Sequence, residues 1–127
     1  MIQRFIELGE GYSDIYELLE IVNRNQDRIQ HFLLMKTEEN KSEFCSLVVI
    51  LKATQTGNFQ PLYICKEGIP YKENSQRIQL FREAAQQIGK SVIELEVRPS
   101  SSFADPNLFY QYLIGILRMN RYILPLG

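Results

Sequence analysis

Glu94 and Glu96 are the carboxylates whose spacing could most readily do chemistry, because they stand two positions apart in the alternating stretch VIELEV. Residues i and i+2 of a β-strand share a face, with side-chain bases about 6.5–7 Å apart, which suits acid–base or metal chemistry. The same alternation is typical of the wet face of an edge strand, where charge discourages aggregation. We favour this second interpretation, and Arg98, which would follow on that face, could simply neutralise Glu96.

The most chemically suggestive segment begins at Arg98 and ends at Asp105. It combines a fixed cation with the hydroxyls of Ser100, Ser101 and Ser102 and a helix start at the carboxyl end of a strand, where α/β sheets often bind ligands. An anionic small molecule is therefore a candidate ligand. The alternative is a capped connection that is rich in serine because serine tolerates turns. Asp105, as the helix cap, would also compete with an anion for the helix amides.

Nucleophilic or zinc chemistry would have to use Cys45, Cys65 or the single histidine, His31. Both cysteines fall in predicted strands, and free thiols in the cytosol most often behave as small buried hydrophobes. His31 shares a strand face with Leu33 and Met35, which is typical of a structural histidine. With one histidine and no cysteine pair at ligand spacing, we expect no metal site and no cofactor.

Gly9-Glu10-Gly11 lies between a predicted strand and a predicted helix, as phosphate-binding turns do. However, Glu10 and Asp14 would repel a phosphate, and neither a third glycine nor a following Lys-Ser/Thr is present. We therefore expect no nucleotide at this turn.

Composition excludes several classes of function. The 127 residues are the size of one domain, and we expect a single domain over residues 1–127. The 14 basic and 15 acidic residues give a net charge of −1, which argues against a nucleic-acid binder. The longest apolar runs, such as residues 46–51, are far too short to span a bilayer, and the acids near the N-terminus do not fit a signal peptide. We therefore expect a soluble, cytoplasmic protein.

Hydrophobic periodicity predicts the elements that must position these residues. They are strands at residues 2–8, 28–36, 43–54, 58–66 and 91–98, and helices at residues 13–22, 75–88 and 106–120. Ser13, Asp105 and Pro106 are helix-start residues, and Gly89 suits a left-handed helix end. Turn residues at 38–41 and 56–58 separate the three consecutive strands.

The strand at residues 43–54 indicates the architecture. It is apolar at nearly every position from Phe44 to Leu51, apart from Ser46, so both of its faces must be covered. The chain order is β-α-β-β-β-α-β-α. We therefore predict an α/β (α+β) fold: a single three-layer domain with a mixed sheet and helices on both faces.

The inner order α-β-β-β-α-β resembles the core of the PD-(D/E)xK nucleases. That family holds a divalent cation with an acid on the second core strand and an acid two residues before a lysine on the third. On this chain the lysine would be Lys66, but the acid position is Ile64, and residues 44–51 contain no carboxylate. Since Mg²⁺ needs oxygen ligands, the resemblance implies a nuclease-like core that lacks the active site. Lys66 is then the charged end of a strand.

A second resemblance covers essentially the whole chain and is carried by four blocks: MIQRFIELGEGYSDIYEL, GNFQPLYICKEGIP, IELEVRPSS and YQYLIGILRMNRYI. These look like a family of small uncharacterised proteins from bacilli, some of which are labelled methylthioribose kinase. A kinase of that type needs two lobes, a glycine-rich loop and catalytic and metal-binding aspartates, and the sequence shows none of these motifs. The resemblance implies a soluble bacterial protein of unknown function, with no functional residues to carry over.

The first functional prediction is a noncatalytic binding or interaction domain that self-associates as a homodimer. Seven tyrosines, seven phenylalanines and the apolar tail at residues 122–124 favour an interface, although such residues also build cores. One alternative is a small enzyme that acts on an anionic metabolite or a nucleic-acid end through Glu94, Glu96 and Lys66. A further alternative is a ligand sensor that uses Arg98 and the serine loop.

Overall fold

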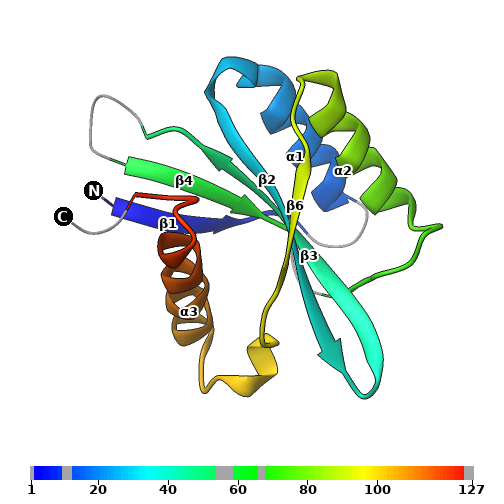
Figure 1. Cartoon of the computed structure of the whole chain (residues 1–127), viewed down its shortest axis with the longest axis vertical. Coiled ribbons are helices and arrows are strands. Elements are labelled where there is room, and N and C mark those ends of the chain that lie inside the picture. Colours follow the sequence, from blue (N-terminus) through cyan, green and yellow to red (C-terminus); the bar gives the residue numbers. More distant parts are fainter. Residues whose placement is uncertain (1, 10–12, 54–58, 66–67, 125–127) are drawn as a thin grey trace.

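The elements form one mixed sheet with helices on both of its faces (Figure 1). The computed structural model describes residues 2–9, 13–53, 59–65 and 68–124. Its strands are β1 (Ile2–Glu7), β2 (Ile29–Glu39), β3 (Ser42–Leu51), β4 (Phe59–Ile64), β5 (Ile69–Pro70) and β6 (Val92–Glu96). Its helices are α1 (Ser13–Arg24), α2 (Gln76–Gln87) and α3 (Pro106–Met119), with short 3-10 turns at Gln26–Arg28 and Ser100–Ser102. The predicted three-layer α/β order is confirmed, with the two-residue strand β5 added to it.

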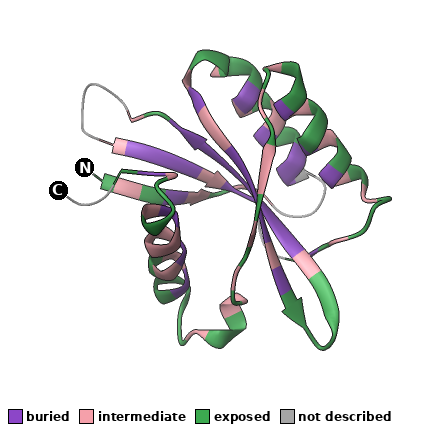
Figure 2. Ribbon diagram, viewed as in Figure 1, coloured by how far each residue is buried: buried purple, intermediate pink, exposed green. Residues whose placement is uncertain are grey.

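The strands lie in the order β1-β4-β3-β2-β6, and β5 pairs with β3. β3 is antiparallel to β2, β4 and β5, whereas β1 is parallel to β4 and β6 is parallel to β2. All strands except β3 therefore point the same way, and their carboxyl ends lie toward one edge of the sheet. β3 is the central strand, as predicted, and is buried from Cys45 to Leu51 (Figure 2).

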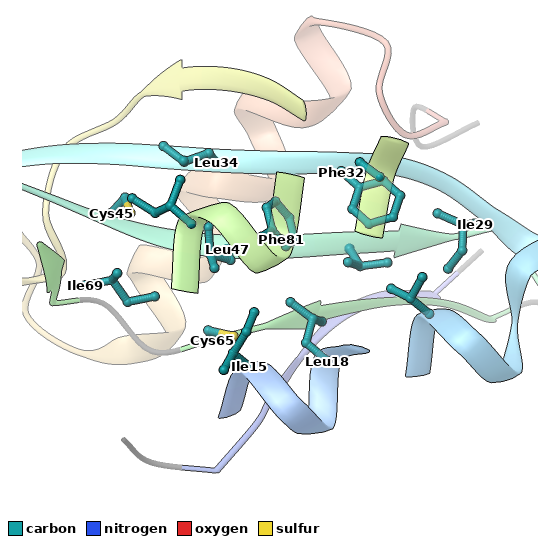
Figure 3. Packing of buried hydrophobic residues seen from close by; sticks show 14 of the residues in the cluster. Ile15, Leu18, Ile29, Phe32, Leu34, Cys45, Leu47, Cys65, Ile69 and Phe81 are labelled. Atoms are coloured by element: carbon teal, nitrogen blue, oxygen red, sulfur yellow. The ribbon is translucent and has the colours of Figure 1, made fainter. Parts of the chain in front are cut away.

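The sheet separates two hydrophobic cores. α1 and α2 lie together on one face and α3 lies on the other (Figure 1). Figure 3 shows the first core, with these labelled side chains: Ile15, Leu18, Ile29, Phe32, Leu34, Cys45, Leu47, Cys65, Ile69 and Phe81. Phe32 and Phe81 meet edge to face with ring centroids 5.4 Å apart, an arrangement that aromatic pairs prefer. In the second core, α3 buries Phe109, Leu113 and Leu117, which recur every four residues along one stripe.

The β2–β3 hairpin corrects the predicted turn at residues 38–41. Glu38 and Glu39 belong to β2, and only Asn40 and Lys41 form the turn, with φ angles of 51° and 65°. Two-residue hairpin turns need positive φ at both central positions because this backbone matches the twist of the strands. The acidic side chains of Glu38 and Glu39 suggested a loop. They fit a strand here because both strands are exposed at this end of the hairpin, where charged side chains stay in water (Figure 2). The other predicted turn, at residues 56–58, lies outside the described residues.

The third predicted strand, residues 58–66, is shorter than expected and is followed by β5. β4 ends at Ile64, and Ile69 and Pro70 form β5, in which Ile69 pairs with Cys45 of β3. Gly68 has a φ of 104°, which a residue with a side chain rarely adopts. The glycine redirects the chain, and the buried Ile69 then returns it to the first core.

The helix ends follow the predicted signals. Asp105 caps α3 by accepting a hydrogen bond from the Leu108 amide at 3.1 Å, and Pro106 is the first helical residue. Gly89 ends α2 with a φ of 73°, as predicted. Arg121, with a φ of 62°, occupies the equivalent left-handed position after α3. The longest of the described helices has 14 residues, and none of them combines the length and hydropathy that crossing a bilayer requires.

Candidate functional site

Glu94 lies on the edge strand β6, on the sheet face that α1 and α2 cover. Val92, two residues earlier, packs into the first core, so Glu94 points to the same side. Its carboxylate accepts a hydrogen bond from the Tyr71 hydroxyl at 2.5 Å and lies 3.6 Å from the guanidinium of Arg82 on α2. Glu94 is therefore an ion-pair partner of a helix that packs above it.

Glu96 lies on the same face, 3.9 Å from the ammonium of Lys36 on the neighbouring strand β2. Lys36 also forms an ion pair with Glu43 at 2.5 Å and lies 4.8 Å above the centre of the Tyr71 ring. Lys36 thus neutralises Glu96, a role that the sequence suggested for Arg98. We call these side chains the β6 ion network: Lys36, Glu43, Tyr71, Arg82, Glu94 and Glu96.

The β6 ion network pairs its three carboxylates with two cations, Lys36 and Arg82, and so keeps one net negative charge. The hydrogen bond to Glu43 raises the pKa of Lys36, and the hydrogen bond to Glu94 raises the pKa of Tyr71. Both shifts hold these donors in their protonated forms. Within the described ranges, no three His, Cys, Asp or Glu side chains are grouped so that they could hold a metal ion. This arrangement can fix α2 and the hairpin to the sheet edge.

Lys36 and Glu43 were missed because the predicted turn was too long. The two-residue turn pairs Lys36 with Cys45 and Glu38 with Glu43. Lys36 and Glu43 are then diagonal neighbours on adjacent strands, a distance that long side chains can bridge. The Asn40-Lys41 pair was the signal that could have revealed this register.

Lys66, the candidate catalytic lysine, lies outside the described residues. The position two residues earlier is Ile64, which is the last residue of β4 and is 2% exposed. Where the nuclease motif places a metal-binding acid, this chain therefore has a core side chain. β3 includes one carboxylate outside the acid-free stretch 44–51, Glu43, and this acid is paired with Lys36.

The serine loop does not gather its polar groups at one point. The Arg98 guanidinium lies 5.1 Å above the centre of the Phe103 ring. Ser101 donates a hydrogen bond to Glu39 of the hairpin at 2.6 Å, and Ser102 is exposed. Ser100 lines a cavity beside α3 and, together with Ser101, a second cavity next to the hairpin. The Arg98 guanidinium lines neither of these two cavities.

The cavity that Ser100 lines beside α3 has a volume of about 380 Å³. Phe103, Phe109 and Tyr110 supply aromatic rings to its wall, and Glu7 and Asp105 supply carboxylates. Ala104, Pro106 and Ile64 complete the lining. Small-molecule sites are typically cavities of this size with mostly apolar walls and a few polar groups. We call this space the α3 cavity.

Two parallel strands position the floor of the α3 cavity. Glu7 and Ile64 are the last residues of β1 and β4, and they pair with each other in the register. The cavity therefore lies at the carboxyl ends of two neighbouring parallel strands, where ligands bind in many open α/β sheets. Glu7 accepts a hydrogen bond from the Tyr110 hydroxyl, which ties the strand end to α3.

Aromatic contacts hold the wall of the α3 cavity in place. The Tyr110 ring stacks on Phe5 of the second core, with centroids 5.1 Å apart. Phe109 lies 5.5 Å from Tyr110 and 5.7 Å from Phe103. Because Phe109 is buried in the second core, these rings are packed from behind and the cavity is preformed. Sequence reasoning missed Glu7 and Tyr110, which are 103 positions apart along the chain.

Another polar contact lies under the start of α1 and α2. Asp14 is 2% exposed and its carboxylate lies 3.9 Å from Arg77. Burial raises the pKa of Asp14, and the charge of Arg77 partly opposes this shift. Of the turn Gly9-Glu10-Gly11, only Gly9 is described, and its amide donates to Glu17 at 3.0 Å.

Cys45 lies in β3 and His31 in β2, as predicted, whereas Cys65 directly follows the last residue of β4 and is not in a strand. Cys45 and Cys65 are free, fully buried thiols, and burial raises the pKa of Cys45 to about 12. His31 is half-buried, with its ring edge-on to Tyr122 at 5.4 Å. Burial and the nearby charge of Lys90 lower the pKa of His31. The structure places each of the three in a packed environment.

Comparison with known proteins identifies a family whose function is unknown. No curated protein and no solved structure matches the chain. A family model described as a domain of unknown function, DUF7147, matches residues 1–123. The protein therefore belongs to the DUF7147 family.

Proposed function

We propose that the protein is a noncatalytic binding domain whose small-molecule ligand occupies the α3 cavity. The observation that carries the proposal is the position of this cavity, at the carboxyl ends of the parallel strands β1 and β4 and beside the first turn of α3. In a sheet with parallel strands, loops and the first turns of helices lie together at the carboxyl ends of the strands. Ligand sites recur at this edge for that reason. The hydrogen bond between Glu7 and Tyr110 supports the proposal because it braces two walls of the cavity.

The β6 ion network supports the noncatalytic part of the proposal. A carboxylate that serves as a general base must be free to take a proton from a substrate. Glu94 instead accepts from Tyr71 and faces Arg82, while Glu96 faces Lys36. We therefore interpret both glutamates as structural, and we assign the ligand to the opposite face of the sheet.

A thermal-shift screen of small metabolites tests the proposal. A ligand that binds only the folded protein at one hundred times its dissociation constant stabilises it by about 2.7 kcal/mol. For a chain of this length, that stabilisation raises Tm by about 10 °C. The screen should include amines, neutral alcohols and phosphorylated or carboxylated metabolites, so that charge is sampled in both directions.

Ala104→Leu is the variant that locates the ligand. Ala104 is exposed and lines the α3 cavity, so a larger side chain there should fill space without disturbing the core. Asn107→Leu adds a leucine at an exposed α3 position outside the lining and serves as the matched control. We expect Ala104→Leu to abolish the shift and Asn107→Leu to retain it. A shift that survives in both variants would place the ligand elsewhere and refute the proposal.

Self-association is a second candidate function, favoured by exposed apolar side chains beside an edge strand. Within the described part of the chain, β1 has a strand partner on one side only. Ile2, Met119 and Leu124 are 56%, 85% and 60% exposed. The Gln3 side chain donates to the Leu124 carbonyl at 2.9 Å, which brings the C-terminal segment beside β1. Such an edge with apolar flanks is a surface on which a second copy can pair.

Light scattering coupled to size-exclusion chromatography tests this second function. We propose a homodimer that dissociates when Met119→Lys places a charge on the apolar surface. Tyr16→Lys is the control, because Tyr16 is 61% exposed but lies on α1, on the other face of the sheet. A strict monomer across the micromolar range would exclude self-association.

We also propose that the protein is bacterial and cytoplasmic. The resemblance to small proteins of bacilli supports the first point. Two free, buried thiols, Cys45 and Cys65, support the second, because a reducing compartment keeps such thiols unpaired. Cell fractionation of a bacterial host that carries the gene checks the location, and recovery in the extracellular medium would contradict it.

A further inference from the structure

We propose that the ligand of the α3 cavity is an organic cation, an ammonium or amidinium group carried on an aromatic or other apolar body. This inference rests on the proposed function, since it assigns a chemical class to the occupant of the same cavity. Two features carry it: the carboxylates in the lining and the aromatic wall.

The two carboxylates in the lining retain acceptor capacity. A carboxylate offers about four acceptor positions. The Tyr110 hydroxyl occupies one position on Glu7, and the Leu108 amide occupies one on Asp105 through Oδ1. The remaining positions can accept N–H groups of a ligand, and charge-assisted hydrogen bonds of this kind are stronger than neutral ones.

The aromatic wall favours a cation with an apolar body. Phe103, Phe109 and Tyr110 present rings whose faces carry negative electrostatic potential, and a cation within about 6 Å of a ring centre is attracted to it. One face of the Phe103 ring is already covered by the Arg98 guanidinium at 5.1 Å, so the ligand cation is assigned to the rings of Phe109 and Tyr110. The rings also provide apolar surface against which the body of the ligand can be buried.

The same groups disfavour the anion that the sequence suggested. An anion in the α3 cavity would lie near the carboxylates of Glu7 and Asp105. It would lose its hydrating water and gain no attractive interaction with an opposite charge in return. The Asp105 carboxylate also occupies the first turn of α3, where an anion would otherwise find free amides. Of the loop serines, Ser101 donates a hydrogen bond to Glu39, and Ser100 lines the cavity.

Three probes of matched shape distinguish the charge classes: phenethylammonium, phenethyl alcohol and phenylacetate. Each is titrated into the ¹⁵N-labelled full-length chain, and dissociation constants come from the movement of the amide signals of Ser100, Ala104 and Phe109. We expect phenethylammonium to bind about tenfold more tightly than phenethyl alcohol, a ratio typical of one charge-assisted hydrogen bond. We expect phenylacetate to bind most weakly.

Two charge-removing variants identify the residues that recognise the cation. Glu7→Gln keeps an acceptor for Tyr110 and removes the charge. Asp105→Asn also removes a charge, and it preserves the helix cap because asparagine caps helices as well as aspartate does. Each variant should weaken phenethylammonium binding several-fold while leaving phenethyl alcohol unchanged. Glu83→Gln is the control, since it removes an exposed carboxylate on α2, on the other face of the sheet, and it should retain the preference for the cation.

The outcomes separate the ligand class from the proposed function. If phenylacetate or phenethyl alcohol binds as tightly as phenethylammonium and moves the same amide signals, the cation proposal is wrong and the α3 cavity remains a binding site. If phenethylammonium moves only other signals, or if both charge-removing variants bind it unchanged, the cation proposal is also wrong. If no probe moves these signals and the metabolite screen finds no ligand sensitive to Ala104→Leu, both the proposed function and the ligand class fail.

Discussion

Glu94→Gln measures whether the β6 ion network stabilises the fold or serves a reaction. The substitution removes the negative charge and keeps an oxygen that can accept from Tyr71. Its main loss is the ion pair with Arg82 at 3.6 Å, between side chains that are 44% and 41% exposed. Solvent screens a pair this exposed, so the expected loss is about 0.5–1 kcal/mol of the free energy of unfolding. For a chain of this length, that loss lowers Tm by about 2–4 °C.

Urea unfolding followed by circular dichroism measures this loss, and salt provides the control. In 1 M NaCl the Debye length is about 3 Å, so the difference between Glu94→Gln and wild type should shrink markedly. Arg82→Gln should cost a similar amount, and the double variant should cost less than the two single variants added together. A more stable Glu94→Gln protein would refute the structural interpretation, because removal of a strained functional carboxylate commonly stabilises an enzyme.

Three further predictions concern stability. Arg121→Gly should stabilise the protein by about 1 kcal/mol, because Arg121 has a φ of 62° and glycine adopts this conformation without steric cost; an unchanged urea midpoint would contradict this. Asp105→Ala should cost about 1 kcal/mol through loss of the helix cap, whereas Asp105→Asn should be nearly neutral, and equal losses in the two would show that the charge rather than the cap matters. Burial raises the pKa of Asp14 above its ordinary value of 3.8, so the folded state binds this proton more tightly than the unfolded chain. The contribution of Asp14 to stability is then complete below pH 3.8 and is lost as the pH rises through the raised pKa. Relative to wild type, Asp14→Asn should therefore gain stability as the pH rises from 3.8 through the raised pKa, and a difference that does not change with pH would contradict the assignment.

Local signals in the sequence predicted much of the fold. Asp105 and Pro106 at the start of α3, Gly89 at the end of α2 and the apolar run of β3 each act within a few neighbouring residues. Helix caps and strand burial depend on such short-range chemistry, and for this reason their prediction was accurate.

The candidate site depends on contacts that no local signal reports. Glu7 and Tyr110 are 103 positions apart, and Ser101 and Glu39 are 62 positions apart. Glu7 meets Tyr110 because β1 and α3 share the second core, and Ser101 meets Glu39 because β6 lies parallel to β2. Both facts require the strand order. The sequence showed the hydroxyls of the serine loop, but the direction of each side chain is set by tertiary packing. The interpretation of Arg98 and the three serines as one anion site remains a prediction.

The hairpin between β2 and β3 shows a second limit. Acidic residues are usual in loops, so Glu38 and Glu39 were assigned to the turn, whereas the turn is formed by Asn40 and Lys41 with left-handed backbones. Asparagine adopts this conformation more readily than most residues, but lysine does so less often. The position of the turn determines which residues of β2 and β3 pair. This register brings Lys36 close enough to Glu43 to form an ion pair.

A crystal structure of the protein soaked with phenethylammonium is the most direct test of the account. We predict electron density for the probe in the α3 cavity, with its nitrogen within hydrogen-bonding distance of the Glu7 carboxylate and its ring against Phe103 or Phe109. Density for the probe at the β6 ion network, or at any place other than the α3 cavity, would contradict the account.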